Sequence, residues 1–320
     1  MDKRIAGYAA LLLSLLAHPA QSALECSSQP APMVFYQPLL RHQGLSEEML
    51  EPIKAKLQAR QVKTIILQWS RYGAYSLWDS GGYDWLQRRL CGNRKYQFIF
   101  GLYADPQFFE QLKLSDAELK DYLHTLAQAN LAEAAKITPH MGEQVKGWYL
   151  SEEIDDLNWQ SLPRQQLLAE HLREQVLALR KLTPGKPVYV STFFGGHSPP
   201  RVYAEMLQRL QQQSGVIWLV QDGQGVRRDP RPDTAAYLQA VAATLPAERW
   251  QGVLEVFTER VKDGQSSFCP VSRPTEARRQ QLWCAATGRA AQAVFSLNQL
   301  AGEQLLDPGQ QCRSQNQRIR

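Results

Sequence analysis

Short runs of apolar, aromatic and β-branched residues recur along the whole chain. Each run is too short for a helix and rich in strand-forming residues, so each predicts a β-strand. The eight predicted strands begin near Val34, Val62, Gln97, Val145, Pro187, Val216, Gly252 and Ala291. They show little alternation of apolar and polar positions, which is typical of parallel strands covered by helices.

Helical patterns lie between these strands. Ser46 precedes one helix, and Ser115 precedes another, with Glu118 placed to complete a capping box. Apolar residues at helical spacing predict four more helices, at 165–182, 200–213, 233–244 and 275–287.

Eight strands that alternate with helices predict a (β/α)8 TIM barrel. The elements span residues 34–298, close to the roughly 250 residues typical of that fold. An open doubly wound sheet is the alternative, but no glycine-rich phosphate loop follows the first strand. We therefore predict a single barrel domain over residues 24–306 and a C-terminal tail over 307–320.

The N-terminal segment has the pattern of an export signal. Lys3 and Arg4 precede an apolar run over 5–17, and small residues follow it. The run is shorter than the roughly 20 residues of a membrane anchor, and the residues before Cys26 match a lipoprotein signal poorly. We predict a signal peptide over 1–23, a periplasmic location, and no membrane span after cleavage.

Composition narrows the class of protein. The 320 residues are 44% hydrophobic and 21% charged, which excludes a disordered or fibrous chain. The net charge is +5, and the basic residues are scattered rather than gathered into the stripe that nucleic-acid binding favours. We predict no nucleic-acid partner.

Five cysteines suit local disulfides in an oxidising compartment. Cys269 is predicted to pair with Cys284 or Cys312, and Cys26 with Cys91. One cysteine is left over, and the sequence does not fix the pairing.

A barrel of this kind carries its active site at the carboxyl ends of its strands. Amide, aromatic and carboxyl side chains collect there, and these groups are suited to hold sugar hydroxyls and to stack on sugar rings. The candidate substrate-binding residues are Tyr36, Gln68, Trp69, Tyr103, Tyr149, Glu152, Gln221 and Asp222.

Two strands end in carboxyl groups suited to catalysis. Glu255 interrupts an apolar run, where an ionisable group is costly unless it has a partner or a function. On the other strand, Glu153 is the catalytic candidate if Tyr149 faces the barrel interior, and Glu152 if Trp148 does. Carboxyls about 5–5.5 Å apart suit a retaining glycosidase, and wider spacing suits inversion.

Structural explanations compete with these interpretations. A buried glutamate can simply pair with a cation, and Asp222-Gly223 is first of all a turn signal. The histidines show neither HxH nor HExxH spacing, so we predict no metal and no cofactor.

The segments GWYLSEEIDDLNW, PVYVSTFFGG, VQDGQG and LEVF resemble a family of secreted bacterial barrels of unknown function. That family is related to glycoside hydrolases and is found beside genes for exopolysaccharide synthesis and secretion. Its pattern commonly has proline where this chain has Ser151, and it keeps the glutamate before isoleucine, which implies Glu153. The resemblance also implies that Tyr149, Gln221 and Asp222 line the cleft.

Two functions follow as hypotheses. The first is a periplasmic glycosidase-like enzyme that acts on a bacterial polysaccharide, with Glu153 as general acid/base and Glu255 as nucleophile. The second is a non-catalytic protein that binds polysaccharide or assists its assembly and export. Polysaccharide or oligosaccharide, and the exopolysaccharide machinery, are the expected partners.

Overall fold

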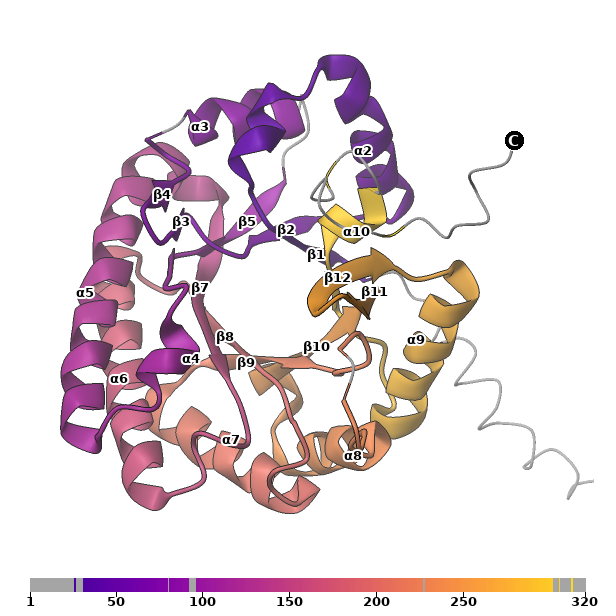
Figure 1. Cartoon of the computed structure of the whole chain (residues 1–320). Coiled ribbons are helices and arrows are strands. Elements are labelled where there is room, and N and C mark those ends of the chain that lie inside the picture. Colours follow the sequence, from indigo (N-terminus) through magenta and orange to yellow (C-terminus); the bar gives the residue numbers. More distant parts are fainter. Residues whose placement is uncertain are drawn as a thin grey trace, which may run out of the picture.

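The computed structural model describes residues 26, 31–79, 81–91, 96–226, 228–301, 305 and 312. In this part of the chain, eight parallel strands close into a barrel with helices around the outside (Figure 1). The predicted (β/α)8 barrel is confirmed. The predicted signal peptide over 1–23 lies outside the described residues, as does the tail over 307–320 except Cys312.

The eight predicted strands all belong to the barrel. They are β1 (Met33–Tyr36), β2 (Thr64–Leu67), β5 (Gln97–Gly101), β7 (Val145–Ile154), β8 (Val188–Thr192), β9 (Ile217–Gln221), β10 (Trp250–Glu255) and β13 (Ala293–Phe295). Their order around the ring is β1, β13, β10, β9, β8, β7, β5 and β2. Met33 pairs with Ala293, which joins the first strand to the last and closes the ring.

Helices begin where the sequence signals them. Ser46 and Ser115 both accept a hydrogen bond from the backbone of the following turn, and Glu118 completes the capping box. The longer helices are α2 (Glu47–Ala59), α5 (Asp116–Met141), α6 (Leu162–Leu182), α7 (Pro200–Ser214), α8 (Thr234–Thr244) and α9 (Arg273–Thr287). The short ones are η1 (Leu40–Gly44), α3 (Gly82–Asp84), η2 (Trp85–Leu90), α4 (Phe108–Gln111), η3 (Gly142–Gln144), η4 (Ala247–Arg249) and α10 (Leu297–Ala301).

Alternate residues of the strands fill the barrel interior. The inner cluster consists of Met33, Phe35, Ile66, Ile99, Tyr149, Tyr189, Leu219, Val253 and Ala293. Trp148 and Leu150 belong instead to the outer cluster that packs against the helices. Tyr149 therefore faces inward, and side chains two or four residues beyond the inner cluster approach the barrel mouth.

Two small sheets lie beyond the barrel, and the sequence patterns did not predict them. One contains β3 (Arg71–Tyr72), β4 (Tyr75–Ser76) and β6 (Tyr103–Ala104). The other is a hairpin of β11 (Phe257–Lys262) and β12 (Gln265–Pro270), which follows β10 and lies beside α10 (Figure 1).

Two disulfides tie the termini to the C-terminal part of the barrel. Cys26 bonds to Cys284, and Cys269 bonds to Cys312. The predicted Cys26–Cys91 pair is wrong, because Cys91 is a free, buried thiol. Within the described ranges, no helix combines the length and the apolar character that crossing a bilayer needs.

Candidate active site

Glu153 lies near the end of β7, on the inward side that Tyr149 defines. The Gln221 side chain, at the end of β9, donates a hydrogen bond from Nε2 to Glu153 Oε1 at 3.2 Å. Burial raises the pKa of Glu153, while the Gln221 hydrogen bond and the Arg228 guanidinium oppose that rise. A carboxyl group with a raised pKa can keep its proton near neutral pH, as a general acid must.

Glu255 is the last residue of β10, two positions beyond the interior residue Val253. Its side chain is only 2% exposed, and its Oε2 accepts a hydrogen bond from the Gly225 backbone at 2.5 Å. A Cβ atom at Gly225 would lie 2.8 Å from that oxygen and 2.5 Å from the Phe257 ring. Only glycine lets this loop approach the carboxyl group so closely.

Burial raises the pKa of Glu255, and the charge of Asp222 raises it further. Arg279 of α9 opposes the rise, and its Nη1 donates to the backbone oxygens of Glu255 and Phe257 at 2.5 and 2.8 Å. Arg228 lowers the pKa of Glu153 and of Glu255. The positive charge of Arg228 therefore favours the ionised form of both carboxyl groups.

Asp222 lies behind the mouth rather than in it. It is fully buried, and its Oδ2 accepts a hydrogen bond from Trp283 Nε1 of α9 at 3.0 Å. Its Oδ1 accepts from the Gln224 backbone at 3.0 Å, as in an Asx turn. The charge of Asp222 acts on Glu255, but the Asp222 oxygens are buried and hydrogen-bonded, so they are not open to a sugar.

Glu152 points away from the mouth, into the layer between β7 and the helices. Its Oε1 lies 3.1 Å from Asn130 Nδ2, 3.3 Å from Gln175 Nε2 and 3.2 Å from His171 Nε2. The pairing of β7 with β8 shifts register between Leu150 and Glu153, and Glu152 sits in that irregularity. The predicted contact of Glu152 with substrate does not match this geometry, because its side chain is occupied on the opposite face.

The two predicted tyrosines are buried at different depths. Tyr149 lies inside the barrel, where its hydroxyl donates to Ser191 Oγ at 2.9 Å. Tyr36 packs outside the ring, and its hydroxyl contacts His42 Nδ1 and Trp85 Nε1, each at 3.0 Å. Tyr149 thus forms the floor beneath Glu153, whereas Tyr36 is enclosed by helical segments and faces no open space.

Three further predicted residues follow β2 and β5. Gln68 accepts a hydrogen bond from Ser151 Oγ at its backbone oxygen, at 2.7 Å. Arg71 stacks over the Tyr103 ring at 4.1 Å from the ring centre. Trp69 is 8% exposed and packs against Tyr72, with ring centres 5.1 Å apart.

A cleft of about 510 Å³ opens at the carboxyl ends of four neighbouring strands, β10, β13, β1 and β2. We call it the aromatic cleft. Its lining residues are Gln37, Leu39, Trp69, Tyr72, Phe257, Phe268, Phe295, Asn298, Gln299 and Leu305. Of these, Trp69 alone was a predicted site residue.

Sequence reasoning missed the cleft because Phe257 and Phe268 belong to the unpredicted hairpin. A usable signal was present: Asp263-Gly264 is a strong marker of a two-residue turn. Both residues have positive φ, 52° and 74°, as such a turn requires.

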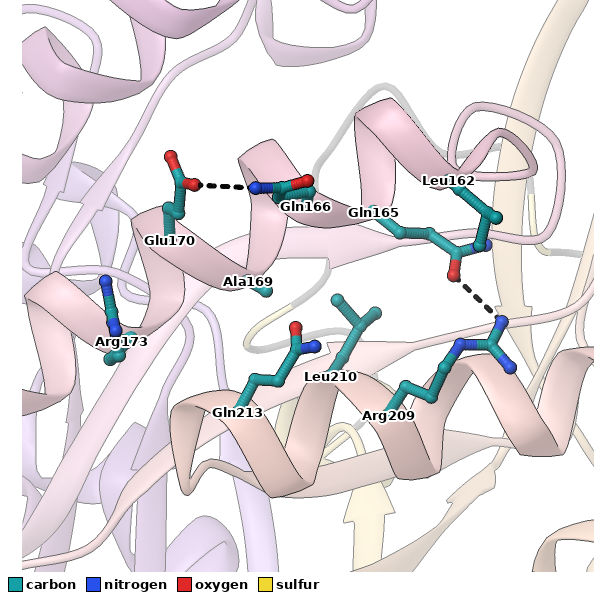
Figure 2. A pocket seen from close by; sticks show the side chains of 9 residues that line it. All are labelled: Leu162, Gln165, Gln166, Ala169, Glu170, Arg173, Arg209, Leu210 and Gln213. Carbon is teal, nitrogen blue, oxygen red and sulfur yellow. Dashed lines mark hydrogen bonds between the residues drawn. The ribbon is translucent and has the colours of Figure 1, made fainter.

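A second hollow, of about 600 Å³, lies on the outside of the barrel between α6 and α7 (Figure 2). Gln165 and Arg209 bridge it with a hydrogen bond of 2.9 Å. None of the predicted site residues lines it. Among the described side chains, no group of three or more His, Cys, Asp or Glu is arranged to hold a metal ion.

Comparison with known proteins supports the fold and identifies the family. An Escherichia coli protein, described as uncharacterized protein YbcH, is 33% identical over 226 residues, which cover 70% of this chain and 76% of that protein. A solved structure described as a candidate α-L-fucosidase from Bacteroides thetaiotaomicron is similar at a TM-score of 0.60 and 15% identity. That match covers 84% of this chain and 85% of the other, and it agrees with the barrel fold. The family described as domain of unknown function DUF4434 matches residues 47–301, and the chain belongs to that family.

Proposed function

We propose that the protein is a periplasmic glycoside hydrolase that acts on a bacterial exopolysaccharide. Glu153 is the general acid/base and Glu255 the nucleophile. The observation that carries this proposal is the presence of both carboxyl groups at one barrel mouth, on β7 and β10, under the influence of the same Arg228 guanidinium.

The proposed reaction has two steps. Glu153 gives its proton to the glycosidic oxygen while the Glu255 carboxylate attacks the anomeric carbon, so the bond to the leaving sugar breaks. The resulting glycosyl ester is then hydrolysed by water, whose proton returns to Glu153. Gln221 holds the Glu153 carboxyl group in position.

Three observations support the wider proposal. The fold resembles a glycoside hydrolase barrel. The two disulfides suit an oxidising compartment such as the periplasm. Aromatic and amide side chains line a cleft beside Glu255 and suit a sugar chain. Contact with the exopolysaccharide synthesis and export machinery belongs to the same proposal.

The test is turnover of the exopolysaccharide made by the source organism, followed by reducing-end release and by NMR of the product anomer. We expect retention of configuration and a loss of about 10³-fold or more in Glu153→Gln and Glu255→Gln, because each removes one half of the proton and nucleophile chemistry. The matched control is Glu248→Gln, an exposed glutamate in η4. Unchanged turnover in Glu255→Gln would overturn the assignment.

One observation favours a second candidate, a polysaccharide-binding protein without catalysis. Glu255 is almost completely buried, and one of its oxygens is already bound by the Gly225 amide. In that case the wild-type protein binds the polysaccharide with no release of reducing ends, and Glu255→Gln binds it equally well.

A further inference from the structure

We propose that the aromatic cleft binds a stretch of uncharged pyranose residues, beside Glu255. This inference rests on the proposed function and adds the class of sugar. It also gives Trp69 a role as a hydrogen-bond donor to the glycan.

The walls of the cleft are suited to the faces of sugar rings. Tyr72 and Phe268 are 45% and 36% exposed, and both line this one cleft, so their rings are accessible to a ligand. Phe257 meets Phe268 and Phe295 edge to face, with ring centres 5.5 and 6.0 Å apart. The rings therefore form a rigid surface, and the apolar C–H face of a pyranose can stack on it.

The described residues that line the cleft carry no charge. Its ten side chains are aromatic, aliphatic or amide. Two of the amides are engaged in the scaffold: Asn298 bonds to the Gln37 backbone at 3.1 and 3.2 Å, and Gln299 Oε1 accepts from Ser296 Oγ at 2.6 Å. A carboxylate, phosphate or ammonium group on the ligand would lose water here without gaining an opposite charge.

Trp69 provides an independent indication of a ligand. Its side chain is more than nine-tenths buried and lines the cleft, yet its Nε1 has no hydrogen-bond partner among the described residues. A buried donor without a partner is unfavourable, because it has given up its hydrogen bonds to water and gained none in the protein. A hydroxyl or ring oxygen of a sugar in the cleft would supply the missing acceptor.

The cleft borders Glu255, which lies behind its Phe257 and Phe295 wall. Phe295 pairs with Glu255 across β13 and β10. The Gly225 backbone lies close to both the Phe257 ring and Glu255 Oε2, so only this segment stands between the ring and the carboxyl group. A glycan on the aromatic surface therefore lies beside Glu255.

The test is isothermal titration calorimetry with oligosaccharides of defined charge. The uncharged probes are cellohexaose, laminarihexaose and chitohexaose, and the charged probes are chitosan hexaose and hexagalacturonate. Chitohexaose and chitosan hexaose form a matched pair, since they differ in the acetyl groups that remove the charge. We expect at least one uncharged probe to bind, and each charged probe to bind at least tenfold more weakly than it.

Variants of the cleft test the residues. Trp69→Phe keeps an aromatic ring and removes the donor, so we expect binding to weaken about three- to tenfold. Phe268→Ala, in the exposed part of the hairpin, is expected to weaken binding about three- to tenfold. Tyr83→Ala is the control. It removes a similarly exposed ring that packs against His140 in the last turn of α5, outside the cleft, and it should leave binding unchanged.

The cleft proposal is overturned if no uncharged probe binds at millimolar concentration or if a charged probe binds as tightly. It is also overturned if the two cleft variants bind like wild type, or if the cleft mediates a dimer that Phe268→Ala dissociates. Failure of the proposed function is distinct. If oligosaccharides bind in the cleft but the polysaccharide is not turned over, the proposed enzymatic function is wrong and the cleft proposal stands. If the polysaccharide is turned over and neither cleft variant changes that turnover, the cleft proposal is wrong and the enzymatic function stands.

Discussion

At the scale of single residues, Glu255 couples stability to pH. Burial and Asp222 raise its pKa above the ordinary value of 4.5 in the folded chain, and the unfolded chain keeps the ordinary value. Its contribution to stability is therefore complete below pH 4.5 and is lost as the pH rises through the raised value. A tenfold change in proton affinity corresponds to about 1.4 kcal/mol.

We therefore expect Glu255→Gln to gain stability relative to the wild type as the pH rises from 4.5 to 8.5, because the glutamine cannot ionise. The measurement is the free energy of unfolding by urea at several pH values, with Glu248→Gln as the control. A difference between Glu255→Gln and wild type that stays constant with pH, or that falls, contradicts the prediction.

Asp222 is expected to set the pH dependence of turnover. As a nucleophile, Glu255 must be ionised, so the acidic limb of kcat/KM follows its pKa. Asp222→Asn removes the negative charge that raises this pKa, and its amide oxygen can still accept the Trp283 hydrogen bond. We expect the acidic limb to move to lower pH. A limb that stays in place or moves to higher pH shows that the Asp222 charge does not act on the nucleophile.

Part of this site could be predicted from the sequence. Strand alternation predicted that Glu153 and Glu152 face opposite sides and that Glu153 is the inward one if Tyr149 is; the structure has Tyr149 inside the barrel and Glu152 outside it. The positions of Asp222 and Tyr36 could not be predicted, because both depend on contacts with Trp283 and Trp85 from distant segments.

At the scale of elements, the hairpin β11–β12 forms one wall of the aromatic cleft, and its turn depends on glycine. Gly264 has φ of 74°, a conformation in which a side chain is strained, although a Cβ there would meet no atom within 4 Å. Gly44 has equally open surroundings without a positive φ.

We expect Gly264→Ala to destabilise the protein by about 1 kcal/mol or more, and Gly44→Ala to be neutral or slightly stabilising. The measurement is the free energy of unfolding of both variants. The two sites differ in backbone conformation but both have free space around an added Cβ. Equal effects of the two substitutions on stability would therefore contradict the argument from the turn.

At the scale of the whole molecule, the barrel could be predicted because its signal is repeated eight times along the chain. If the pattern of one strand is ambiguous, the other strands and the helices between them still predict the barrel. The disulfide pairing had no such redundancy: Cys26 and Cys284 are 258 residues apart, and their proximity follows only from the closed ring. The hairpin was missed because it is an insertion between β10 and α9, outside the repeat.

Cys91 provides a test of the pairing. Burial raises the pKa of its thiol to about 12, so very little thiolate forms in the native protein. We expect iodoacetamide at pH 8 to leave the native protein unmodified and to label one cysteine after unfolding without reductant. Peptide mapping should then find Cys26 linked to Cys284 and Cys269 to Cys312. Labelling in the native state, or a peptide that links Cys26 to Cys91, contradicts this.

The pairing of Met33 with Ala293 has a consequence for the order of folding. The second neighbour of β1 is β13, the last of the eight barrel strands to be synthesised. A growing chain therefore has two open strand edges in its barrel sheet until residues 293–295 have emerged. Contacts of such long sequence separation form late and slowly. A chain that ends before residue 293 would keep β1 and β10 as unpaired edges, and we expect it to aggregate where the full chain folds.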